Sequence, residues 1–192
     1  PEVARTTKYL RPRALTQRTF DRIDAATRAG KPFFGMLFFS TTHLPYTARY
    51  PHNVRYTDPD YTGPHKYEID VKVHELISTG FDQAPAPETI EHIRALYDGA
   101  VREFDSHVGE VLAELERRGL ADNTVVVITS DHGEDLYDPG STLGHGTNFF
   151  GGDQSTRIPF FIRAPGVTRP GSAIPAITRN VDLAPTFATL LG

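Results

Sequence analysis

An aspartate and a histidine stand next to each other shortly after an apolar run. The run covers residues 124–128, and Asp131 and His132 follow it, with Gly133 next. Gly133 makes a sharp bend easier, so both side chains can turn toward one point. A carboxylate oxygen and an imidazole nitrogen together suit Zn, Mn or a similar divalent ion. The pair is a candidate metal site. The alternative is an ordinary turn in which Asp131 caps the next segment and His132 is solvated.

Two further histidines lie in similar surroundings. His43 follows the apolar run 33–39, where a histidine could act as a general acid or hydrogen-bond an oxyanion. His145 stands between Gly144 and Gly146, which permit close approach of the backbone to a ligand. The alternatives are that the His43 ring ties down the following turn, and that the His145 segment is a flexible surface loop.

These residues need a scaffold of alternating strands and helices. Apolar periodicity predicts helices over residues 16–29 and 88–118, and a third that Asp182 caps and that ends at Leu191. Short apolar runs over 33–39, 124–128 and 158–162 predict strands buried on both faces. The pattern indicates an α/β fold with a mainly parallel central sheet flanked by helices, in which ligands gather beyond the carboxyl ends of the strands.

Composition narrows the function. The 192 residues carry a net charge of -4 with no basic block, which argues against nucleic acid as a partner. No run of about 18 apolar residues occurs, so no membrane span is predicted. Cysteine is absent, so disulfides and thiolate ligands are excluded from this segment. Residues 44–87, rich in proline and tyrosine, predict a long loop excursion with one short helix near 68–78.

Several blocks in order resemble one family. Residues 123–134 are similar to the signature of sulfatases and their alkaline-phosphatase-superfamily relatives, and His43-x-Pro45 resembles an earlier block. Later blocks of the same family resemble residues 144–146, 157–166 and 181–186. The resemblance runs from about Phe33 to Gly192 and identifies the chain as the C-terminal part of a single catalytic domain.

The resemblance implies a metal-dependent hydrolase of sulfate esters. Asp131 and His132 would be metal ligands, and His43 and His145 would contact the sulfate or phosphate group or its leaving oxygen. The cofactor would be a divalent ion, namely Ca, Mn, Zn or Mg. The substrate would be a sulfate or phosphate ester. The protein would be located in the cell envelope or the periplasm, or be secreted.

The sequence also departs from the family pattern. Residues 1–32 contain neither a Cys/Ser-x-Pro-x-Arg nucleophile block nor an Asp-Asp pair. We therefore expect a partial domain, 1–192, that lacks the N-terminal half with which it would pair and that is inactive alone. Many sulfatases place a lysine nine positions before the arginine that is Arg157 here, where this chain has Asn148. Losing that charge weakens the sulfate assignment, although Asn148 could still donate a hydrogen bond to substrate.

Two alternatives follow from these departures. One is a phosphodiesterase or a phosphoglycerol or phosphoethanolamine transferase of the same superfamily, which His132 after the metal-binding aspartate also fits. The other is a non-catalytic, sulfatase-like binding or regulatory module at the cell envelope.

Overall fold

The computed structural model describes residues 12–69, 85–139, 141–145 and 153–192. The chain divides into two compact units, residues 1–118 and residues 119–192. Each unit has its own elements, and the candidate residues Asp131, His132 and His145 all belong to the second. The expectation of one partial catalytic domain stays a prediction.

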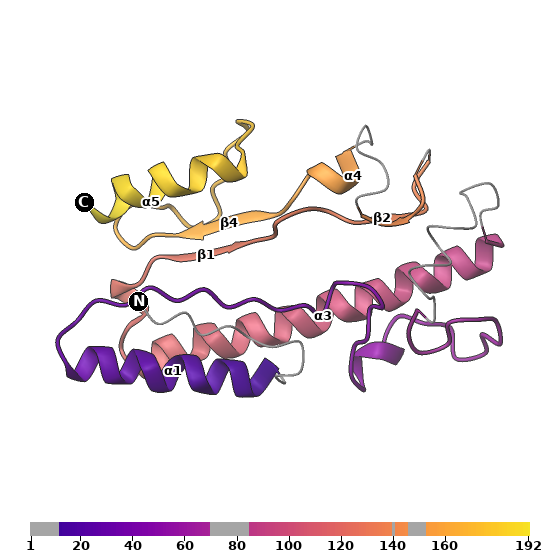
Figure 1. Cartoon of the computed structure of the whole chain (residues 1–192), viewed down its shortest axis with the longest axis horizontal. Coiled ribbons are helices and arrows are strands. Elements are labelled where there is room, and N and C mark those ends of the chain that lie inside the picture. The colour runs from indigo at the N-terminus through magenta and orange to yellow at the C-terminus, as the bar shows by residue number, and fades with distance from the viewer. Residues whose placement is uncertain (1–11, 70–84, 140, 146–152) are drawn as a thin grey trace. The chain divides into compact units, whose positions relative to one another are not determined.

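The described part of the first unit is built on α1 (Pro12–Arg28) and α3 (Pro87–Arg117), which run side by side in Figure 1. The helices predicted over residues 16–29 and 88–118 are confirmed. The hydrophobic residues that they bury are Leu15, Phe20 and Ile23 of α1, and Ile93, Leu96, Ala100 and Leu115 of α3. At the end of α3, Arg118 stacks its guanidinium 4.5 Å from the Phe20 ring and pairs with Asp24 at 2.9 Å, so it fastens α3 to α1.

The expected loop excursion passes close to α3. Its short 3-10 helix η1 (His52–Val54) contacts α3 at Gly99, where a Cβ atom would lie only 2.5 Å from the His52 carbonyl oxygen. The absence of a side chain at Gly99 therefore allows the loop backbone to lie on the helix. Most of the short helix expected near 68–78 lies outside the described residues.

A charged network joins the same loop to α3. Arg49 donates from its backbone N–H to Glu103 Oε2 at 2.8 Å and from Nε to Oε1 at 2.5 Å. Arg49 Nη2 also lies 3.1 Å from His107 Nε2. Glu103 and His107 are both buried, so the network stabilises the first unit.

The segment 33–39 is not a strand. It forms no ladder with any described segment, and its Phe34 and Met36 are each 80% exposed. Phe39, at the end of the run, packs against α3, with its ring stacked 5.7 Å from the His107 ring. The prediction of a doubly buried strand is wrong for the described structure, because an apolar run reports a tendency to be buried and says nothing about a pairing partner.

The described residues of the second unit form two small antiparallel sheets. β1 (Val126–Thr129) pairs with β4 (Phe160–Arg163), as Figure 1 shows, and β2 (Asp135–Leu136) pairs with β3 (Leu143–Gly144). The strands expected at 124–128 and 158–162 therefore exist, but the mainly parallel sheet is not found among the described residues. Phe161 of β4 is 64% exposed. Apolar content alone could not give the direction of pairing.

Short helices complete the second unit. They are η2 (Ala121–Asn123), α4 (Asp153–Thr156), η3 (Asn180–Asp182) and α5 (Leu183–Leu191). The closing helix is confirmed, but Asp182 does not cap it with its side chain. Instead, Asp182 Oδ2 accepts the backbone N–H of Arg179 at 2.8 Å, because η3 turns the chain before α5 begins.

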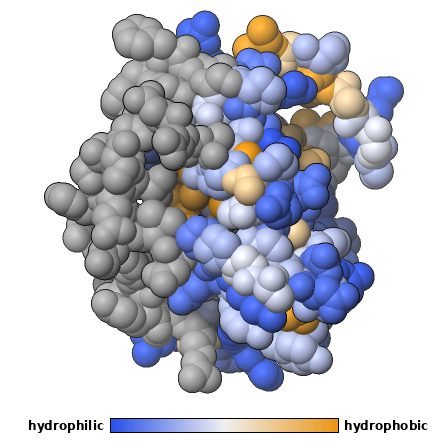
Figure 2. All heavy atoms as spheres, turned by 90° about the vertical axis from the view of Figure 1, so that its right-hand side faces the viewer, coloured by the Kyte–Doolittle hydropathy of each residue, from blue (hydrophilic) through white to orange (hydrophobic). Residues whose placement is uncertain are grey.

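Among the residues that Figure 2 colours, most of the visible surface is hydrophilic, and hydrophobic residues form small, separate spots. Among the described helices, none is both long and apolar enough to cross a membrane.

The Arg49–Glu103 contact makes a testable contribution to stability. Burial would raise the pKa of Glu103, but hydrogen bonds from the Arg49 backbone and guanidinium, with the charges of Arg49 and His107, lower it below its ordinary value of 4.5. Because the pKa of Glu103 is lower in the folded protein, the contact contributes its full stability at pH values above the ordinary pKa. That contribution is lost as the pH falls through the pKa of the folded state.

We expect Glu103→Gln to lower the opening free energy of the α3 amides by about 1–3 kcal/mol at neutral pH, because a charged hydrogen bond is lost. Hydrogen exchange would measure it. The loss of stability between pH 6 and 3 should be smaller in the variant than in the wild type. Glu116→Gln, an exposed position on the same helix, is the matched control. Equal acid sensitivity of Glu103→Gln and wild type would contradict the assignment.

Candidate functional site

The turn that follows β1 carries the aspartate and histidine pair. Ser130 Oγ donates to the His132 carbonyl at 2.8 Å, and Thr129 Oγ1 donates to the Pro159 carbonyl at 3.0 Å. These bonds tie the turn to itself and to the segment before β4. Asp131 is largely exposed and His132 is about one-third exposed, so both side chains are accessible.

Gly133 determines the path of this turn. Its N–H donates to the Ser155 carbonyl at 2.9 Å, and a Cβ atom at Gly133 would lie 1.8 Å from the Gln154 carbonyl oxygen. A second bond reinforces the contact with α4, because Ser155 Oγ donates to the buried Asp135 at 2.6 Å. The close approach therefore places the turn after β1 directly against α4.

His132, Glu134 and His145 form one cluster. One ligand atom from each lies within 4.8 Å of the others. His145 Nδ1 lies 3.4 Å from both Glu134 carboxylate oxygens, and the His132 and His145 rings are 4.0 Å apart. β2 and β3 bring His145 here, since Asp135 pairs with Gly144. The cluster could hold a divalent ion.

Glu134 had no role in the sequence analysis, although it belongs to the same motif as Asp131 and His132. Its side chain is only 6% exposed. The signal that could have found it is its place in the motif, directly after Gly133 and two residues beyond His132. Its partner, His145, is 11 residues further on, and only the β2–β3 pairing shows that the two meet.

Asp131 lies at the edge of this cluster. Its Oδ1 accepts the His132 backbone N–H at 3.1 Å and lies 3.7 Å from His132 Nε2. The His132 Nδ1 is 2.7 Å from the Gly133 carbonyl. In the tautomer whose Nδ1–H donates to the Gly133 carbonyl, Nε2 carries the lone pair that could bind a metal ion. Nε2 is also the nitrogen on the side of Asp131.

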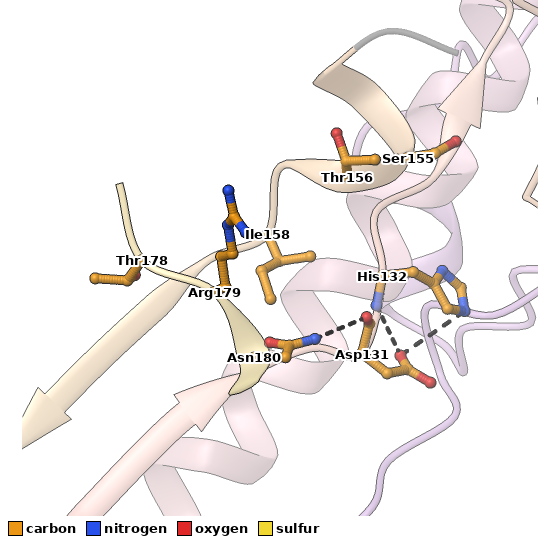
Figure 3. A pocket seen from close by; sticks show the side chains of 8 residues that line it. All are labelled: Asp131, His132, Ser155, Thr156, Ile158, Thr178, Arg179 and Asn180. Atoms are coloured by element: carbon orange, nitrogen blue, oxygen red, sulfur yellow. Dashed lines mark hydrogen bonds and ion pairs between the residues drawn. The ribbon is translucent and has the colours of Figure 1, made fainter. Parts of the chain in front are cut away.

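A pocket of about 290 Å³ opens beside Asp131 and His132 (Figure 3). Its other lining residues are Ser155, Thr156, Ile158, Thr178, Arg179 and Asn180. Asn180 Nδ2 donates to the Asp131 carbonyl at 3.1 Å, so the segment before α5 is fastened to the turn after β1. No sequence pattern singled out residues 178–180, because their relevance comes from this contact.

The remaining candidates lie elsewhere. His43 is exposed on a loop of the first unit, with Nδ1 2.7 Å from the Leu44 carbonyl. The loop is anchored by Tyr46, which is fully buried, has a φ of 56° and packs edge-to-face 5.2 Å from Tyr97. His43 therefore belongs to the first unit, whereas Asp131, His132 and His145 belong to the second. Asn148 lies outside the described residues.

The class of protein that this chain represents follows from comparison with known proteins. The sulfatase family model matches residues 3–192, so the chain belongs to the sulfatase family. Its relatives and structural neighbour are ester hydrolases of the alkaline phosphatase superfamily.

Particular relatives cover the chain to different extents. Steryl-sulfatase of Rattus norvegicus is 40% identical over 53% of this chain and 19% of the relative. The multifunctional alkaline phosphatase superfamily protein PehA of Trinickia caryophylli is 30% identical over 94% of this chain and 39% of the relative. The solved structure of the phosphonate monoester hydrolase SpPMH from Silicibacter pomeroyi superposes with a TM-score of 0.53 at 32% identity, over 85% of this chain and 29% of that one. The chain thus spans less than half the length of these proteins.

The close approach at Gly133 can be tested directly. Gly133→Ala should destabilise the chain by about 1–3 kcal/mol, because the new Cβ must push the Gln154 backbone away. Urea denaturation would measure the loss, and NMR shifts should move at His132 and Ser155. Gly109→Ala, where a Cβ meets nothing within 4 Å, is the control and should be neutral or slightly stabilising. Unchanged stability of Gly133→Ala would show that α4 does not restrain the turn.

Proposed function

We propose that the protein is a metal-dependent hydrolase of sulfate esters. The observation that carries the proposal is the cluster of His132, Glu134 and His145 beside Asp131, in a chain of the sulfatase family. Both carboxylates and both imidazoles stand on turns after strands, and a pocket opens at the same place. The arrangement supports catalysis over a purely structural role for these polar groups.

The donor groups fit a divalent ion. Ligand atoms about 2.0–2.6 Å from one ion lie no more than about 5 Å apart. The 3.7 Å between Asp131 Oδ1 and His132 Nε2 meets this condition, as does the 4.8 Å limit of the three-residue cluster. We assign Asp131 and His132 as ligands and Glu134 as a further carboxylate within reach. Imidazole nitrogen favours Zn or Mn over Ca or Mg, which prefer oxygen alone.

A bound ion would polarise the ester oxygen and lower the pKa of the nucleophile. The residues of this chain would do the rest. His145, whose Nδ1 lies 3.4 Å from the Glu134 carboxylate, is assigned to contact the sulfate or phosphate group or its leaving oxygen. His43, whose Nδ1 lies 2.7 Å from the Leu44 carbonyl oxygen, is assigned the same kind of contact.

The nucleophile is assigned to residues outside this chain. Cysteine is absent and residues 1–32 hold no nucleophile block of the family pattern. The 192 residues alone should therefore bind metal without turning over substrate. Asn148 is retained as a hydrogen-bond donor to substrate, and the cell envelope, the periplasm or the exterior as the location.

A second candidate function is hydrolysis of phosphate or phosphonate esters. It is favoured by the similarity to the phosphonate monoester hydrolase structure and by Asn148 in place of the lysine that many sulfatases carry. Comparing kcat/KM for p-nitrophenyl sulfate and p-nitrophenyl phenylphosphonate in the full-length protein separates the two. We expect the sulfate ester to be preferred, and a preference for the phosphonate would move the assignment to the second function.

The metal assignment predicts the behaviour of two variants. His132→Ala and Asp131→Asn should each weaken binding of Zn²⁺ or Mn²⁺ by at least about 10- to 100-fold, because even indirect support of a ligand is worth that much. Calorimetric titration of the chain would measure affinity, and ester hydrolysis by the full-length protein should fall in parallel. Asp122→Asn, an exposed aspartate of the same unit, is the matched control. Unchanged metal affinity in His132→Ala would remove the ligand assignment.

A further inference from the structure

The pocket beside Asp131 and His132 has a cationic side that the proposed chemistry does not use. Arg179 is the one permanently charged cation among the described residues that line it. Figure 3 shows Thr178 and Arg179 on the side of the pocket away from His132. The apolar side chain of Ile158 and the hydroxyl of Thr156 also line the pocket.

The Arg179 side chain is available for a ligand. Among the described residues, no carboxylate lies within ion-pair distance of its guanidinium. Its backbone, in contrast, is fixed: the N–H donates to Asp182 Oδ2 at 2.8 Å, and the carbonyl accepts the Asp182 N–H at 2.9 Å. This fixed backbone, with a guanidinium that meets no carboxylate in the described parts of the chain, contrasts with Arg49 and Arg118, which are paired with Glu103 and Asp24.

The next residue ties this cation to the candidate metal ligands. Asn180 donates to the Asp131 carbonyl at 3.1 Å, so Arg179 is one residue from a direct contact with the turn after β1. The pocket therefore has a carboxylate and an imidazole at one side and a guanidinium at the other. A divalent ion would neutralise the first side and leave the guanidinium unmatched.

We propose that Arg179 binds an anionic group on the alcohol portion of the substrate. The inference rests on the proposed function and names its substrate class: small esters whose leaving alcohol carries a second acidic group. A guanidinium pairs with a carboxylate, sulfate or phosphate through two parallel hydrogen bonds. The same charge disfavours alcohols that carry a cation, and the 290 Å³ volume suits a small carbon skeleton.

Three aryl sulfates test the inference: 4-carboxyphenyl sulfate, the neutral 4-acetylphenyl sulfate and 4-(trimethylammonio)phenyl sulfate. Binding to the metal-loaded full-length protein would be measured by calorimetry, and kcat/KM separately. We expect Arg179→Gln to weaken binding of the carboxylated probe by about fivefold or more, to leave the neutral one unchanged and to strengthen binding of the cationic one. The wild-type preference should shrink at high salt.

Arg169→Gln is the matched control, since it removes one exposed arginine of the same unit that does not line the pocket. Equal losses for all three probes in Arg179→Gln would overturn the inference, because Arg179 would then contact the sulfate group itself. No change for any probe would also overturn it. If the protein hydrolyses none of the esters but still prefers the carboxylated probe through Arg179, the hydrolase function fails and the binding inference stands.

Discussion

The second unit depends on one close approach of two backbones, that of Gly133 to Gln154 and Ser155. No side chain fits between them, and the Gly133 N–H is bonded to the Ser155 carbonyl. The contact fixes the chain at the point where β1 ends. Asp131 and His132 lie before it and Glu134 after it, so a single glycine divides the ligand candidates and allows them to converge. Ser155 and Asp135 then hold the two sides of the turn together.

The two units use charged groups for different purposes. In the first unit, Glu103 and His107 are buried and meet Arg49, so their hydrogen bonds are directed inward and contribute stability. In the second, Asp131 and His132 are accessible from a pocket, and Arg179 lies on its opposite side without a carboxylate partner among the described residues. Accessible groups of opposite charge across one pocket are suited to a polar ligand, whereas a buried, saturated network is suited to fastening a loop to a helix.

The sequence predicted the helices well and the sheet poorly. The 3.6-residue spacing along α3 records which side faces the core, so both the existence and the length of the helix could be inferred. The run 33–39 is as apolar as a buried strand, yet it has no pairing partner among the described segments. β1 and β4 were located, but their antiparallel pairing depends on how residues 130–159 return the chain, which apolar content does not encode.

The candidate site was predicted in part. The motif after β1 singled out Asp131 and His132, and the glycines around His145 singled out that histidine. Glu134 and Arg179 could be found only from the structure, because the β2–β3 pairing brings His145 to Glu134 and the Asn180 contact brings Arg179 to the pocket.

The central claim is that the turn after β1 holds a divalent ion. Anomalous diffraction from crystals of the Zn- or Mn-loaded protein tests it most directly. The account predicts a peak at bonding distance from His132 Nε2 and from a carboxylate oxygen of Asp131 or Glu134, and a metal bound without contact to His132 would contradict it.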